Sequence, residues 1–63
     1  MSDLQELRDR IAALIADVEQ IAGERGRFLP AVYYHLGHAL RVLKSAIAAI
    51  DEAIRLEEQE DEP

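Results

Sequence analysis

Two stretches of this sequence repeat large apolar residues at alternating spacings of three and four. The first stretch contains Leu4, Leu7, Ile11, Leu14, Val18 and Ile21. The second contains Tyr33, Leu36, Leu40, Leu43, Ile47, Ile50 and Ile54. This spacing is typical of amphipathic helices that present one apolar seam. We therefore predict an all-α chain with one helix over about residues 3–22 and a second over about residues 30–60.

The segment 23–29, between the two seams, carries the signals of a chain reversal. Gly23 lies just past the first seam, where a glycine commonly ends a helix, and Gly26 follows it. Pro30 is tolerated in the first turn of a helix but not in its interior. The sequence therefore predicts a two-helix antiparallel hairpin with its turn at 23–29. The two apolar residues expected to cover the turn end are Phe28 and Leu29.

The two predicted helices differ in length. If the turn brings Ala22 near Ala31, the first helix runs out opposite about Ile50, at about 1.5 Å of rise per residue. Ile50, Ala53 and Ile54 would then have no cover from their own chain. We expect a second chain to cover them.

A chain of 63 residues seldom buries enough apolar surface to be secure without a disulfide, a metal or a partner chain. The sequence has no cysteine, which excludes disulfides and thiolate zinc sites. Oligomerisation is therefore the expected source of stability. The residues expected to form a dimer core are Leu7, Ile11, Leu14, Val18, Leu36, Leu40, Leu43, Ile47, Ile50 and Ile54.

The formal net charge of -6 is unevenly distributed over the single domain formed by residues 1–63. Residues 1–22 carry two arginines against five carboxylates, and residues 23–44 carry four basic side chains against one carboxylate. Residues 45–63 carry one arginine against seven carboxylates and end in an acidic tail, 57–63, that we expect to fray. A hairpin would place the basic segment at the turn and both acidic segments at the open end. Opposite charges meet if two hairpins pack antiparallel, so we expect a homodimeric antiparallel four-helix bundle.

The N-terminal residues are acidic, whereas a secretory signal begins with a basic segment followed by an apolar one. The uncharged apolar runs, such as 45–50, are far shorter than the roughly 18 residues needed to span a membrane. We expect a cytoplasmic protein that makes no membrane contact.

One surface of the second predicted helix, close to the basic turn, has the composition of a binding site. A glycine inside a helix costs about 1 kcal/mol relative to alanine, so Gly37 either admits close approach of a partner helix or ring or is a tolerated defect. Tyrosine and arginine are enriched among the residues that dominate binding energies. The side chains expected to bind a partner protein are Arg27, Tyr34, Gly37, His38, Arg41 and Val42.

Groups that could carry chemistry are few. His35 and His38 are neighbours on a helix and could share a metal ion, but two ligands do not complete a site within one chain. The two serines, Ser2 and Ser45, have no evident base, and the sequence contains no glycine-rich phosphate loop. We therefore expect a protein that is not an enzyme and that uses no cofactor.

One family resemblance rests on Leu7-Arg8, Ile11, Ala13-Leu14 and Glu24-Arg25. These residues resemble the first helix of the all-helical chorismate mutases, whose two active-site arginines have the spacing of Arg8 and Arg25. Ile15 stands where that family has an aspartate, and Pro30 interrupts what would be one long helix. We interpret the match as a pattern common to heptad helices.

The length and hairpin plan are also similar to those of the Rop-like plasmid regulators, four-helix dimers that bind paired RNA loops. That similarity is one of architecture, and architecture does not imply function. We expect a self-associating protein–protein interaction module, either a small regulator, an inhibitor, an assembly adaptor or an engineered bundle. A metal-binding bundle, with His35 and His38 from two chains, is one alternative. The other is nucleic-acid binding through the turn region, which the acidic net charge disfavours, by Arg25, Arg27, His35, His38, Arg41 and Lys44.

Overall fold

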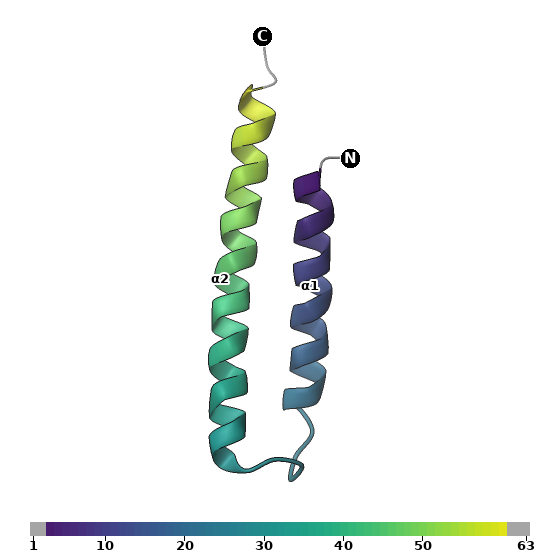
Figure 1. The fold of residues 1–63 in the computed structure, drawn as a ribbon, viewed down its shortest axis with the longest axis vertical. Helices are drawn as coiled ribbons and strands as arrows, with labels where there is room; N and C mark the ends of the chain where they lie inside the picture. The colour runs from purple at the N-terminus through teal and green to yellow at the C-terminus, as the bar shows by residue number, and fades with distance from the viewer. Residues whose placement is uncertain (1–2, 61–63) are drawn as a thin grey trace.

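The computed structural model describes residues 3–60, which form two antiparallel helices joined by one loop (Figure 1). Helix α1 spans Asp3–Ala22 and helix α2 spans Pro30–Glu60. The predicted all-α hairpin and its turn at 23–29 are confirmed. The tail that we expected to fray is helical as far as Glu60, and its last three residues lie outside the described part of the chain.

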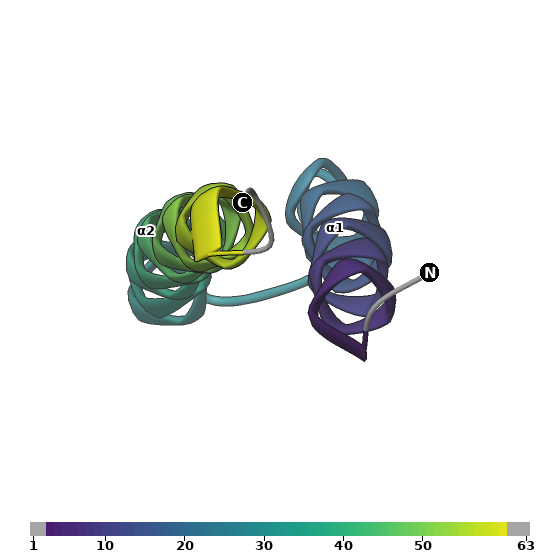
Figure 2. The ribbon, with the colours of Figure 1, turned by 90° about the horizontal axis from the view of Figure 1, so that it is seen from above.

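The hairpin is elongated, with extents of 55 × 17 × 11 Å. Its radius of gyration is 15.3 Å, whereas a compact domain of this length would have about 11 Å. Seen from above, the two helices lie side by side, and the described residues place no third element across either face (Figure 2). Each helix therefore has one neighbour, which covers only one side of it.

The line along which α1 meets α2 differs from the seam read off the sequence. Ile15 lies on this line, is only 9% exposed, and is the one buried residue among those described. The sequence pattern placed Ile15 outside the seam. Leu7 and Leu14, which the pattern placed inside it, are exposed. The described residues of α1 that face α2 and are partly or fully buried are Leu4, Arg8, Ile11, Ile15, Val18 and Ala22.

On α2 the structure agrees with the sequence pattern. Every member of the predicted seam, from Tyr33 to Ile54, is partly buried against α1 within one chain. Helix α2 extends past the first turn of α1 at the open end (Figure 1). Ile50, Ala53 and Ile54 are nevertheless partly buried in the single hairpin, so the prediction that they lack intrachain cover is wrong.

The register of the two helices explains this error. The Arg8 Nε donates a hydrogen bond of 2.9 Å to the Asp51 Oδ1 near the open end. Ile50 therefore lies beside α1, several residues inside its N-terminus. The sequence estimate placed Ala22 beside Ala31, but the loop follows the first turns of α2 and shifts the helices relative to each other.

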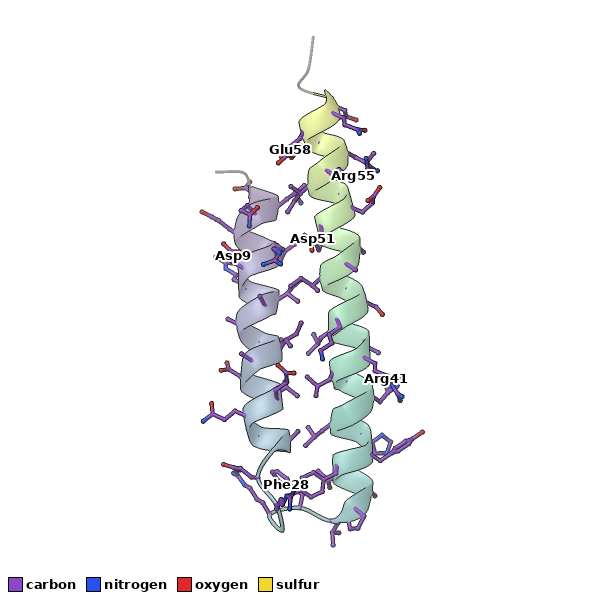
Figure 3. The ribbon with its side chains drawn as sticks, turned by 180° about the vertical axis from the view of Figure 1, so that it is seen from behind. Asp9, Phe28, Arg41, Asp51, Arg55 and Glu58 are labelled. Carbon is purple, nitrogen blue, oxygen red and sulfur yellow. The ribbon has the colours of Figure 1, made fainter. Side chains whose placement is uncertain are left out.

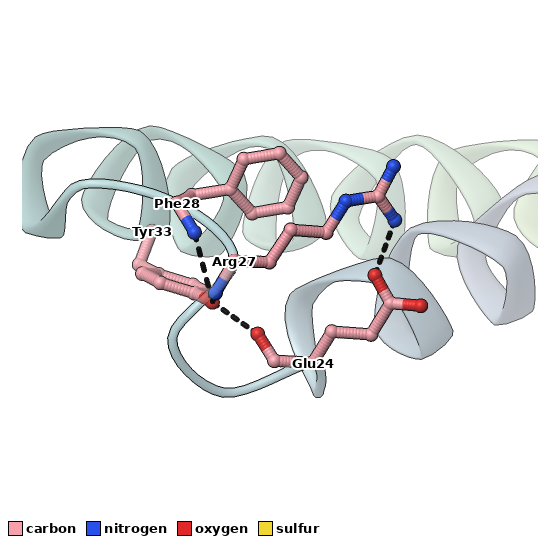
Figure 4. Close-up of polar contacts among 4 residues, drawn as sticks. All are labelled: Glu24, Arg27, Phe28 and Tyr33. Carbon is pink, nitrogen blue, oxygen red and sulfur yellow. Dashed lines mark hydrogen bonds and ion pairs between the residues drawn. The ribbon is translucent and has the colours of Figure 1, made fainter.

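The Tyr33 hydroxyl holds the loop against α2 (Figure 4). It accepts hydrogen bonds from the backbone N–H groups of Arg27, at 3.1 Å, and Phe28, at 3.4 Å, and it donates one to the Glu24 carbonyl. The Phe28 ring is partly buried and meets the Tyr33 ring edge-to-face, with centroids 5.6 Å apart. Phe28 thus covers the turn end as predicted. Leu29 does not, because it is 74% exposed.

Backbone contacts complete the turn. The Gly23 N–H still donates to the Glu19 carbonyl at 3.0 Å, so Gly23 continues the hydrogen-bonding pattern of α1. The left-handed residue is Gly26, with a φ of 76° that side chains other than glycine rarely adopt. The Leu29 carbonyl accepts the Val32 N–H at 2.9 Å and starts α2, with Pro30 as its first residue.

Replacing Tyr33 with phenylalanine should loosen this loop and leave both helices in place. The variant keeps the ring contact with Phe28 but removes the hydroxyl from three largely exposed backbone partners, so we expect a loss of about 0.5–1.5 kcal/mol in the free energy of unfolding. Denaturation followed by circular dichroism at one protein concentration measures it. Tyr34→Phe is the matched control, since Tyr34 is 69% exposed on the outer side of α2. Equal losses in the two variants would show that the Tyr33 hydroxyl does not hold the loop.

Candidate interaction surfaces

Helix α1 carries a row of large apolar side chains that its own chain leaves uncovered. The row consists of Leu7, Leu14 and Ile21, all of them exposed, with Leu14 at 48%. Residues seven apart lie almost in line along a helix of 3.6 residues per turn. Each member of the row stands one position before a residue of the contact line, or about 100° around the helix from it. The row therefore lies along one side of the hairpin.

Helix α2 carries a matching row of small residues, Ala39, Ala46 and Ala53. Each alanine also stands one position before a residue of the α2 contact line. In antiparallel helices, positions that precede the contact line fall on the same side of the pair. The two rows therefore form one surface, the apolar face, which consists of Leu7, Leu14 and Ile21 of α1 and Val32, Ala39, Ala46 and Ala53 of α2.

The opposite side of the hairpin is polar. Arg8 pairs with Asp51 there at 2.9 Å, and the Lys44 Nζ lies 3.6 Å from the Glu19 Oε2. Exposed pairs of this kind contribute about 0–1 kcal/mol each, so they mark this side as a solvated surface more than they stabilise the hairpin. The charges on one side of the molecule are thus paired within the chain, and the other side carries the apolar face.

The predicted partner-binding residues of α2 lie on its outer surface. Tyr34, His38 and Arg41 follow one another at spacings of four and three, and Arg41 points away from α1 (Figure 3). Tyr34 and Val42 are among the exposed large apolar side chains. A Cβ atom built on Gly37 would meet nothing within 4 Å, so the surface beside it is open.

Arg27, the sixth predicted partner-binding residue, makes its contacts inside the loop. Its guanidinium pairs with the Glu24 carboxylate and lies 5.0 Å from the centroid of the Phe28 ring. The hydrogen bond to Glu24 and the charge of that carboxylate raise the pKa of Arg27 above its ordinary value. The structure therefore gives Arg27 a role in the turn that the sequence pattern did not indicate.

The basic segment at the turn is also partly neutralised within the hairpin. Lys44 pairs with Glu19, and Arg27 pairs with Glu24. Among the residues that the structure describes, Arg25 and Arg41 make no ion pair. At the acidic end, the hydrogen bond from Arg55 lowers the pKa of the Glu52 carboxyl.

Gly37 gives a direct test of what surrounds α2. In a single hairpin, Gly37→Ala adds a methyl group that meets no atom and removes the cost of a helical glycine. We expect the free energy of unfolding to rise by about 1 kcal/mol, seen as an upward shift in the melting temperature. Gly26→Ala is the control and should lower stability, because its φ is 76°. A lower melting temperature for Gly37→Ala would indicate that a partner packs against Gly37.

Neither a metal site nor a pocket is evident in residues 3–60. Within this range no three or more His, Asp or Glu side chains lie close enough together to hold a metal ion. His35 instead meets the Tyr34 ring at 5.4 Å between centroids. The same range contains no pocket and no helix that is both long and apolar enough to cross a membrane.

Comparisons of the chain with protein-family models, curated proteins and solved structures found no match. The candidate surfaces therefore rest on the geometry of the hairpin itself.

Proposed function

We propose that this chain is a non-catalytic helical interaction module that associates with a second copy of itself into an antiparallel four-helix bundle. The observation that carries the proposal is the exposed row Leu7, Leu14 and Ile21 on a hairpin in which Ile15 is the one buried residue between positions 3 and 60. Burial of apolar surface is the main favourable contribution to folding. A second copy would supply the apolar burial that one hairpin lacks.

The accessible area of the hairpin supports the same conclusion. The chain exposes 5006 Å². A folded monomer of its mass, 7.1 kDa, would expose about 4,100 Å², so the hairpin exposes roughly 900 Å² more. A standard specific interface buries about 800 Å² on each partner. Covering one face of the hairpin would therefore bring it close to the surface expected of a folded protein.

Charge supports the antiparallel orientation. The turn end carries Arg25, which makes no intrachain ion pair among the described residues. The open end carries the acidic residues from Glu57 to Glu60. With the turns at opposite ends of the bundle, each basic end lies beside an acidic end.

The outer surface of α2 would stay accessible in such a bundle. The side of α2 that is turned away from α1 and from the apolar face carries Tyr34, Gly37, His38 and Arg41. We propose that this surface binds another protein, as a small regulator, inhibitor or assembly adaptor would.

The test is the mass in solution over a concentration series, with circular dichroism on the same samples. We expect a helical dimer that dissociates on dilution, with a loss of helical signal as it does so. A helical monomer that persists to high micromolar concentration would contradict the proposal.

A further inference from the structure

The exposed side of α1 carries charged residues among its apolar ones, in an order that has a direction. The residues on this side follow one another at spacings of three and four, and each is exposed. In chain order the helical residues are Asp3, Leu7, Arg10, Leu14, Asp17 and Ile21. Arg25, in the loop beyond the helix, follows four residues later and is added to this set.

The four charged members of this set have no ion-pair partner within the part of the chain that the structure describes. Arg8, one position after Leu7, pairs with Asp51 on the other helix. Arg10 and Asp17 are exposed on the side away from that pair and take part in none. Their positive and negative charges are thus available to a neighbouring chain.

Read from either end, the row has apolar and charged residues in the same order, with Leu14 at the centre. Each charge in the reversed row has the opposite sign. When the row is set against a second copy running the opposite way, Leu14 meets the partner's Leu14, and Leu7 meets the partner's Ile21. Arg10 then lies level with the partner's Val18, one residue or about 1.5 Å of helix rise from the partner's Asp17. By the same register, Asp3 lies toward the partner's loop, which carries Arg25. A parallel alignment would place each charge against its like.

We propose that α1 packs antiparallel against the α1 helix of a second copy, with Leu14 at the two-fold axis and Arg10 paired with the partner's Asp17. This inference rests on the proposed self-association and specifies which helices meet. The other face-to-face arrangement sets α1 against the partner's α2, where Arg10 would lie over alanines. The charges of α1 therefore favour the first arrangement.

The same arrangement suits α2. When α1 lies on the partner's α1, α2 lies on the partner's α2, and the small row of one copy faces the small row of the other. Helix axes come within about 8–10 Å, depending on the side chains at the contact. Ala39 and Ala46 permit the closer end of that range.

Charge reversal tests the pairing. Arg10→Asp places two acidic side chains together at two symmetric sites, and we expect it to weaken dimerisation about tenfold at low salt. Asp17→Arg should weaken it similarly, and the double variant Arg10→Asp/Asp17→Arg should restore it to within about threefold of the parent. Arg41→Asp is the matched control, since it makes the same change of net charge on the outer surface of α2. Equal weakening by this control, or a double variant that is no better than the singles, would overturn the pairing.

Single cysteines test the axis without relying on charge, because the chain has no cysteine of its own. Under mild oxidation Leu14→Cys should give a disulfide-linked dimer, since a two-fold axis brings the two Cα atoms within about 7 Å. Ala48→Cys, on the side of α2 away from the apolar face, should remain largely unlinked. The protein could be a dimer by mass while Leu14→Cys forms no more disulfide-linked dimer than Ala48→Cys. That result would overturn the arrangement and leave self-association intact. A parent chain that stays monomeric would overturn both.

Discussion

Leu14→Asp is expected to abolish the proposed self-association and to leave a monomer that has lost most of its helical signal. Leu14 is 48% exposed on the hairpin but central to the apolar face. A two-fold dimer contains the substitution twice. Burying a leucine contributes about 1.5–3 kcal/mol, and burying an unpaired carboxylate costs more. Dimerisation should therefore weaken by at least about 100-fold.

Sedimentation or light scattering at matched concentrations would measure this change, and circular dichroism would follow the helices. Leu29→Asp is the control, because Leu29 is equally apolar and 74% exposed but lies in the loop, off the apolar face. If Leu14→Asp remained a dimer with the affinity of the parent, the apolar face could not be the interface.

Ile15→Ala should unfold much of the protein by weakening the contact between the two helices of one chain, not the contact between chains. Ile15 is the best-buried residue between the two helices of one chain, and such truncations cost about 2–5 kcal/mol. A chain of this length has a total stability of about 3–9 kcal/mol. Thermal or chemical denaturation should show a much lower midpoint, with Leu56→Ala, on the outer surface of α2, changing it little. Equal shifts for the two variants would show that the contact line is placed wrongly.

The sequence predicted the helices well because their signals are local. The apolar periodicity, the glycines of the turn and Pro30 act within a few residues of one another, and the observed bounds, Asp3–Ala22 and Pro30–Glu60, agree with the prediction. The same periodicity could not show which part of the apolar stripe faces the neighbouring helix. Leu7 and Ile15 both belong to a stripe wide enough for two neighbours, and only the pairing with α2 distinguishes them.

The register was mispredicted because it depends on a contact that no periodicity reveals. Tyr33 occupies a seam position, and the apolar periodicity does not indicate that its hydroxyl bonds to three backbone groups of the loop. Those bonds decide how far the loop runs along α2 and therefore which residues of the two helices lie level. Arg27 was likewise placed in a binding surface, whereas its contacts lie with Glu24 and Phe28. A tyrosine at the start of a helix that follows a glycine-containing loop was the available clue.

The hydrogen bonds of the Tyr33 hydroxyl also influence the order in which the hairpin folds. Its bond to Glu24 joins residues nine apart in the chain, whereas the Arg8–Asp51 bond joins residues 43 apart. The entropy cost of closing a loop grows with its length, so contacts beside the turn form first and each makes the next a short closure. We therefore expect the two helices to pair first at the turn during folding and to separate first at the open end during unfolding. Backbone amides near Tyr33 should exchange with solvent more slowly than those near Asp51.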